Sequence, residues 1–170
     1  SDETAGAEID AKGEFRFESD AIRPGSYDLA LGGSQGYYLK QIAASGAKIT
    51  GRNLEISGGG AVHLACLISH GVGTITGMAV RNGKGIAGVM VLLVPQDPTH
   101  NLPLFRRDQS DSDGTFTLQN VLPGRYTLLA LQNGWDLEWG NPSVLSPYLK
   151  SGTSLEVHSG QEPDLKVEVQ

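Results

Sequence analysis

Apolar residues along this chain alternate with polar ones over short stretches and rarely recur every third or fourth position. Thr115–Leu118 is typical, since Phe116 and Leu118 alternate with two threonines. This period of two belongs to β-strands, whose successive side chains point to opposite faces. Gly, Pro, Asn and Asp separate the stretches, as turns require. The pattern predicts an all-β protein, in which the best candidate for a helix, Tyr38–Ala47, is short.

Two stretches about a hundred residues apart carry the same pattern. Each predicts a turn, an alternating strand, a Pro-Gly turn and a second alternating strand, so the chain contains an internal repeat. The shared positions are Asp10, Gly13, Phe15, Phe17, Ile22, Pro24, Gly25, Tyr27 and Leu29 in the first stretch, and Asp111, Gly114, Phe116, Leu118, Leu122, Pro123, Gly124, Tyr126 and Leu128 in the second.

The two repeats differ in length. The second opens with Gly73–Val80 and then Ile86–Val94, a nearly continuous apolar run that predicts a strand buried on both faces. Nothing before Asp10 supplies matching strands. We therefore expect an incomplete sandwich over residues 1–70, the N-terminal unit, and a complete one over 71–170, the C-terminal unit. The incomplete unit is expected to be covered by the C-terminal unit, by a second chain or by further residues of a longer array.

These motifs resemble the carboxypeptidase regulatory-like domain, which is related to the B-type repeats of collagen adhesins and to transthyretin-like and starch-binding-like sandwiches. The resemblance rests on Asp-x-x-Gly-x-Phe followed by Pro-Gly-x-Tyr-x-Leu. In the C-terminal unit it extends to Gly73–Gly77 and Gly88–Val91. It implies an Ig-like or transthyretin-like (prealbumin-like) antiparallel β-sandwich. Domains of this kind are accessories in bacterial extracytoplasmic proteins, so secretion, the periplasm or the cell surface is the implied location.

Charge and composition narrow the function classes. The chain has 170 residues and a net charge of −6, without a run of Lys or Arg, so we expect no nucleic-acid binding. No apolar stretch reaches membrane-spanning length, and the first residues lack a signal-peptide pattern. The single cysteine, Cys66, lies in an apolar run and is expected to be a buried, inert thiol.

Catalysis is not indicated by the sequence. None of the four histidines lies in a zinc-peptidase pattern, and there is no Gly-x-Ser-x-Gly motif. In the family that the chain resembles, the sandwich is the non-catalytic appendage. We therefore predict a protein that is no enzyme and needs no cofactor.

Both tryptophans lie in the segment Gly134–Pro142, the tryptophan segment. On an extended strand Trp135, Leu137 and Trp139 would share one face, with Asp136 and Glu138 on the other. Such a face predicts either a sugar-binding platform or a cap on the core. The aligned part of the first repeat is also aromatic, with Tyr37 and Tyr38.

Three aspartates, Asp108, Asp111 and Asp113, are the weak candidates for a calcium site. The twelve-residue loop and terminal Glu of an EF-hand are absent, and Lys12 replaces Asp113 in the first repeat. We therefore interpret the cluster as an Asx turn and predict no metal site.

The hypothesis that follows is a non-catalytic extracytoplasmic spacer or interaction module of a longer bacterial protein. Two alternatives remain: a carbohydrate-binding module that uses the tryptophan segment, and a protein-docking domain whose partner covers the open edge of the first repeat. The expected partners are a polysaccharide or another protein, with self-association through residues 1–70 as a further possibility and no insertion into a membrane.

Overall fold

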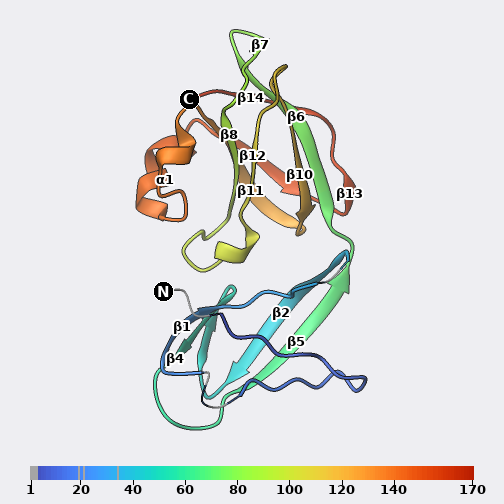
Figure 1. Ribbon diagram of the computed structural model, residues 1–170, viewed down its shortest axis with the longest axis vertical. Coiled ribbons are helices and arrows are strands. Elements are labelled where there is room, and N and C mark those ends of the chain that lie inside the picture. The colour runs from blue at the N-terminus through green and yellow to red at the C-terminus, as the bar shows by residue number, and fades with distance from the viewer. Residues whose placement is uncertain (1–3, 19, 21, 34) are drawn as a thin grey trace.

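The protein is a mostly β structure built from antiparallel sheets. The computed structural model describes residues 4–18, 20, 22–33 and 35–170. Figure 1 shows the N-terminal unit below and the C-terminal unit above, stacked along the long axis. The strands of the N-terminal unit are β1 (Gly25–Asp28), β2 (Tyr37–Ser45), β3 (Lys48–Thr50), β4 (Asn53–Ile56) and β5 (His63–His70).

The C-terminal unit has more strands and contains all the helical turns of the described chain. Its strands are β6 (Gly73–Arg81), β7 (Lys84–Gly85), β8 (Met90–Pro95), β9 (Arg106–Gln109), β10 (Thr115–Val121), β11 (Gly124–Leu131), β12 (Thr153–Val157), β13 (Gly160–Gln161) and β14 (Leu165–Glu168). Its helices are the 3-10 turns η1 (Leu102–Leu104) and η2 (Gly134–Asp136) and the α-helix α1 (Pro142–Leu149).

Two sheets face each other in the C-terminal unit and form a β-sandwich. One sheet is centred on β6, which pairs antiparallel with β10 and parallel with β13 and β14. The other has the order β12-β11-β8-β9. Inward residues of both sheets form one core cluster, in which Ile75 and Phe116 lie against Leu93 and Leu128. The alternation that predicts β10 and β11 is therefore the inward face of this sandwich.

Strand β8 is buried on both faces, which explains its unbroken apolar run. Val91 and Leu93 belong to the core between the sheets. Met90, Leu92 and Val94 point to the opposite face and form a second cluster with Leu145 of α1. The helix lies beside this sheet in Figure 1. The expected strand over residues 86–94 is shifted, because Ala87-Gly88 forms a turn and the ladder begins at residue 90.

The N-terminal unit has two small sheets, β1-β4-β3 and β2-β5. Only Leu39 and Leu54 are buried apolar residues among its described positions. The candidate helix Tyr38–Ala47 is strand β2, since it pairs with β5 from Tyr37 to Ser45. The alternating stretch at Glu14–Phe17 is not a strand in the structure. Its counterpart β10 forms a ladder with β6, and the described part of the N-terminal unit has no counterpart of β6.

The two repeated turns nevertheless have the same hydrogen bonds. The amide of Gly13 donates to the carbonyl of Asp10 at 3.0 Å, and that of Gly114 donates to the carbonyl of Asp111 at 2.9 Å. Both glycines lie in the left-handed region, with φ of 81° and 88°. In each motif the tyrosine hydroxyl donates to a carbonyl four residues earlier, from Tyr27 and from Tyr126.

Candidate functional site

The tryptophan segment is not a strand, which corrects the extended geometry expected for it. Gly134–Asp136 is a 3-10 turn closed by the Leu137 amide on the Gly134 carbonyl. Gly134 is packed so closely that an added Cβ would lie 2.7 Å from Cβ of Met90. The segment then bends toward α1, whose N-cap is Asn141. Trp135 and Trp139 therefore do not form a flat platform with Leu137.

Both tryptophans instead lie beside Arg107 of β9. Its guanidinium carbon is 5.6 Å from the centre of the Trp135 ring and 4.9 Å from that of Trp139. Trp139 is half-buried and packs on Phe105, with ring centres 5.4 Å apart. Trp135 is 45% exposed. The arrangement is a cation–π stack with one accessible ring, and Asp136 and Glu138 are exposed beside it.

Tyr37 and Tyr38 lie elsewhere, at the junction between the two units. There they line a cavity of about 190 Å³. Arg106, which precedes Arg107 on β9, lines the same cavity. Because neighbouring residues of a strand point to opposite faces, the tyrosines and the tryptophans belong to two different sites. Residues of both units line this cavity, among them Leu29, Leu39 and Arg52 of the N-terminal unit and Leu104, Asn120 and Leu122 of the C-terminal unit.

Hydrogen bonds and close packing connect the two units at the junction. The turn Gly51-Arg52 between β3 and β4 reaches the loop before η1, where the Arg52 amide donates to the His100 carbonyl at 2.8 Å. A Cβ on Gly51 would lie 2.6 Å from Oδ1 of Asn101. Asn101 is itself held by the carbonyls of Gln96 and Asp97, both at 3.0 Å. The long loop between β8 and β9 thus contacts the N-terminal unit.

A linker of two residues, Gly71 and Val72, connects β5 of the N-terminal unit to β6 of the C-terminal unit. The Gly71 amide donates to the Gly36 carbonyl of the N-terminal unit at 2.9 Å. The Val72 carbonyl accepts from the Gly160 amide of the C-terminal unit at 3.0 Å. Each linker residue is therefore tied to a different unit.

Arginines on both sides of the junction are partly buried. Arg106 donates to the carbonyls of Pro103, Phe105 and Asn120, and Arg52 donates to the carbonyl of Leu39. Burial lowers the pKa of both guanidinium groups, and the nearby Tyr126 opposes the shift. Burial likewise raises the pKa of Tyr126 to about 12, against the opposing effect of the two arginines.

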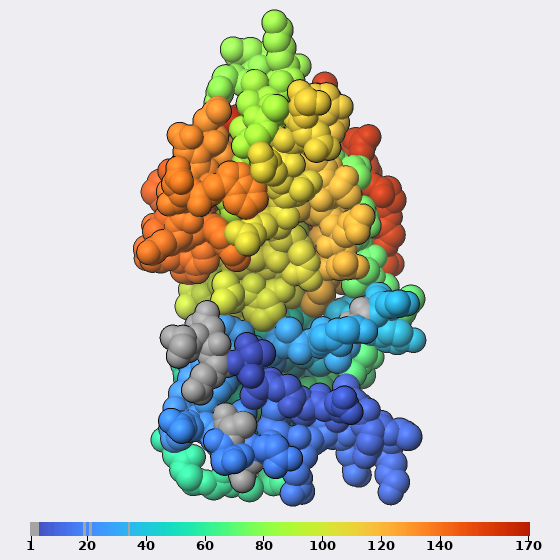
Figure 2. Space-filling view, viewed as in Figure 1, coloured from blue at the N-terminus to red at the C-terminus, as the bar shows by residue number. Residues whose placement is uncertain are grey.

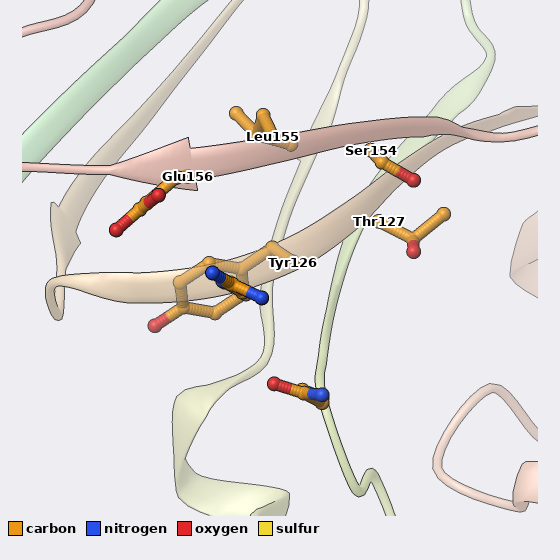
Figure 3. Close-up of a pocket in the computed structure, with 7 residues that line it drawn as sticks. Tyr126, Thr127, Ser154, Leu155 and Glu156 are labelled. Carbon is orange, nitrogen blue, oxygen red and sulfur yellow. The ribbon is translucent and has the colours of Figure 1, made fainter.

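A second, more open hollow of about 410 Å³ lies over β11 and β12 (Figure 3). Tyr126 and Thr127 come from β11, and Ser154, Leu155 and Glu156 from β12. Arg125 and Glu156 are cross-strand partners at its wall. In Figure 2 the orange atoms of the α1 region cover the left side of the C-terminal unit, and the two units meet without a wide gap.

Two of the three aspartate side chains, those of Asp108 and Asp113, accept hydrogen bonds from backbone amides. Asp113 Oδ1 accepts from the amide and the hydroxyl of Thr115 at 3.0 and 2.6 Å, which lowers the pKa of this carboxyl. Asp108 accepts from the amides of Gln109 and Thr117, both at 2.9 Å. The Asp111 amide donates to the Thr115 carbonyl. Within the ranges that the structure describes, no cluster of His, Cys, Asp and Glu could hold a metal ion.

The single cysteine, Cys66 on β5, is half-buried instead of fully buried, and burial raises the pKa of its thiol.

Among the described residues, none of the helices has the length and apolarity to span a bilayer.

Part of the C-terminal unit is similar in sequence to one known family. Residues 72–146 match the sequence model of the family described as BOS complex subunit NOMO1-like, second beta sandwich domain. Among solved structures, the TIE protein of Bacillus anthracis aligns at 15% identity with a TM-score of 0.38, over 94% of this chain and 31% of that chain. This chain thus spans about a third of the length of that structure. No curated protein matches the chain.

Proposed function

We propose that the chain is a non-catalytic spacer and interaction module of carboxypeptidase regulatory-like type, within a longer extracytoplasmic bacterial protein. The observation that carries this proposal is the junction, in which a two-residue linker and the turn Gly51-Arg52 tie the units together. A spacer needs a fixed distance between its ends, and short hydrogen-bonded connections supply it. The matched family is described as a subunit of a complex, which supports a role in contacting other proteins.

The test measures the distance between the units. The exposed Lys40 and Lys84 are replaced by cysteines in a Cys66→Ser background, and each cysteine receives a nitroxide label. Double electron–electron resonance then measures the distance between the two labels. A narrow distance distribution is expected, and Gly51→Val is expected to broaden it, because the new side chain meets Asn101 and the His100 carbonyl.

Gly13→Val is the matched control for this substitution. Gly13 also has a positive φ, but a Cβ there meets nothing within 4 Å. Its distance distribution is expected to stay narrow. A broad distribution in the unmodified junction would contradict the spacer proposal.

A second candidate function is carbohydrate binding at Trp135, favoured by the 45% exposure of that ring beside Arg107 and two carboxylates. Sugar rings stack on exposed aromatic faces, and their hydroxyls bond to nearby charged groups. Tryptophan fluorescence with iodide quenching and titration by soluble polysaccharides tests it. A blue shift on adding a glycan, lost in Trp135→Ala, is the expected result. Emission that responds to no glycan would reject this function.

A further inference from the structure

The cavity at the junction carries positive charge from both units. Arg52, in the turn between β3 and β4, and Arg106, on β9, both line it. Both side chains are half-buried, and burial lowers the pKa of both guanidinium groups. Tyr126 interacts electrostatically with each of them. Its own pKa of about 12 leaves it uncharged at neutral pH, so it does not neutralise the two arginines.

Acidic side chains do not balance these two charges in the part of the chain that the structure describes. Among the described residues that line the cavity, none is Asp or Glu. The salt bridges of the described residues involve neither arginine. Partly buried charges are normally paired, because a charge away from water is costly unless an opposite charge or hydrogen bonds compensate it. The cavity therefore has a positive potential that favours a bound anion.

Both guanidinium groups are positioned by the fold. Arg106 donates through Nε and Nη2 to the carbonyl of Asn120 at 3.0 and 2.8 Å. The backbone amide of Arg52 donates to the His100 carbonyl, and its Nη2 donates to the Leu39 carbonyl. This is the one hydrogen bond of the Arg52 guanidinium to described residues, so its other N–H groups can bond to a ligand.

The rest of the cavity is largely apolar and has the size of a small molecule. Leu29 and Leu39 line it from the N-terminal unit, and Leu104 and Leu122 from the C-terminal unit. Its volume is about 190 Å³. An apolar cavity of about 150 Å³ holds benzene, so there is space here for one ring or one branched aliphatic group beside a charged group. A small inorganic anion would leave the apolar wall without a contact.

We propose that the junction cavity binds a small organic carboxylate with a compact apolar body. The carboxylate accepts from the guanidinium of Arg52, whose planar N–H groups match two carboxylate oxygens, and Arg106 adds a second positive charge. The apolar body lies against leucines of both units. This inference goes beyond the spacer role and does not rest on it.

The test titrates sodium benzoate into the ¹⁵N-labelled 170-residue chain at neutral pH and follows two-dimensional NMR spectra. The Nε–H signals of Arg52 and Arg106 and the backbone amides of Leu39 and Leu122 are expected to shift together and to saturate. The indole N–H signals of the tryptophan segment are expected to keep their positions, because that segment belongs to a different site.

Three further probes separate charge, shape and source on the unmodified chain. Benzamide has the same ring without the charge and is expected to bind at least about tenfold more weakly. Inorganic phosphate has the charge without an apolar body and is also expected to bind more weakly than benzoate. N-acetylleucine represents the carboxyl end of a peptide, so the tighter binding of N-acetylleucine or benzoate indicates whether a chain end or a free acid is preferred.

A matched pair of variants tests the assignment to Arg52. Arg52→Gln is expected to weaken benzoate binding at least about tenfold, because a charge-assisted hydrogen bond is lost. Arg81→Gln removes the same charge from an exposed position on β6 and is expected to change the affinity less than about twofold. The amide signals of β8 and β11 show whether each variant keeps its fold.

Three outcomes would overturn the proposal. The first is no saturating shift of the Arg52 and Arg106 signals with benzoate. The second is equal affinity for benzoate and benzamide, or for benzoate and phosphate. The third is an Arg52→Gln chain that is folded and binds benzoate as tightly as the unmodified chain. If Arg52→Gln does not fold, the comparison of the three probes on the unmodified chain still decides.

Discussion

Two tyrosines make the same hydrogen bond in different surroundings. Tyr27 donates to the Arg23 carbonyl at an exposed site, whereas Tyr126, 4% exposed, donates to the Leu122 carbonyl beside Arg52 and Arg106. The sequence motif specifies the bond. The sheets packed around it determine how strongly the hydroxyl is held in its neutral form.

Tyr126 is expected to make the stability of the fold depend on alkaline pH. Its pKa is raised to about 12 in the folded state, against about 10 for an unfolded tyrosine. Its contribution is therefore complete below pH 10 and is lost as the pH rises toward 12, with roughly 1.4 kcal/mol lost between pH 8 and pH 11. Urea unfolding at both pH values measures it.

Tyr126→Phe is expected to remove this pH dependence and to lower stability at pH 8 by about 1–3 kcal/mol, because the Leu122 carbonyl loses its donor. Tyr27→Phe serves as the control and is expected to retain the pH dependence. An identical loss in wild type and Tyr126→Phe between pH 8 and pH 11 would contradict the assignment to Tyr126.

The paired turn glycines give a second prediction at this scale. Gly13→Ala is expected to destabilise by about 1–2 kcal/mol, the cost of a left-handed backbone for Ala. Gly114→Ala is expected to cost clearly more, because its Cβ would lie 2.6 Å from Cα of Gly85 and 2.8 Å from the Ala79 carbonyl. Thermal unfolding of both variants compares them. Equal costs would mean that the β6–β7 turn gives way easily.

At the scale of elements, local patterns predict pairing only where a partner strand exists. The alternation at Thr115–Leu118 forms β10 because β6 lies beside it. The same alternation at Glu14–Phe17 forms no ladder, and no property of those four residues could reveal this. The burial of β8 on both faces is predicted correctly from its nearly all-apolar composition, although the strand begins at residue 90 and not at residue 86.

The candidate sites were harder to predict than the strands. Extended geometry for the tryptophan segment is wrong because Gly134 packs against Met90 and the chain turns there. Helix α1 is not predicted, although Asn141-Pro142 is a helix-start signal and Leu145, Tyr148 and Leu149 have helical spacing. Pro147 within the helix weakens that signal. The cation–π stack of Arg107 on Trp135 and Trp139 joins residues that are far apart in the sequence, so local patterns do not predict it.

Removing the cap of α1 tests how firmly this helix is held. Asn141→Ala is expected to destabilise the C-terminal unit by about 1 kcal/mol, because Oδ1 of Asn141 accepts from the Ser143 amide at 3.0 Å. Asn133→Ala is the control, since Asn133 precedes η2 without a side-chain cap bond. Urea denaturation followed by circular dichroism measures both, and equal effects would argue against a capping role.

At the scale of the molecule, the two units differ in how much apolar surface they bury. Both core clusters lie in the C-terminal unit, and the described N-terminal unit has two buried apolar residues. Since burial supplies most of the free energy of folding, we expect the N-terminal unit to be the less stable of the two and to depend on its contacts at the junction.

Unfolding is therefore expected in two steps, with the N-terminal unit first. Trp135 and Trp139 both lie in the C-terminal unit, so tryptophan fluorescence reports that unit alone, whereas circular dichroism reports both. The midpoint by dichroism is expected at lower urea than the midpoint by fluorescence. Gly51→Val should widen the gap between the two midpoints and Gly13→Val should not. Coincident transitions would show that the junction makes the units one cooperative body.

The parallel pairing of β6 with β14 has a mechanical consequence. The chain enters the C-terminal unit at the start of β6 and reaches residue 170 just after the end of β14. The two strands run side by side, with Gly77 opposite Leu165 and Val80 opposite Glu168. Tension applied to the two ends would pull these neighbouring parallel strands in opposite directions along their length. Their hydrogen bonds would be loaded in shear, all together, instead of opening one after another. The unit would resist stretching along this direction far better than peeling.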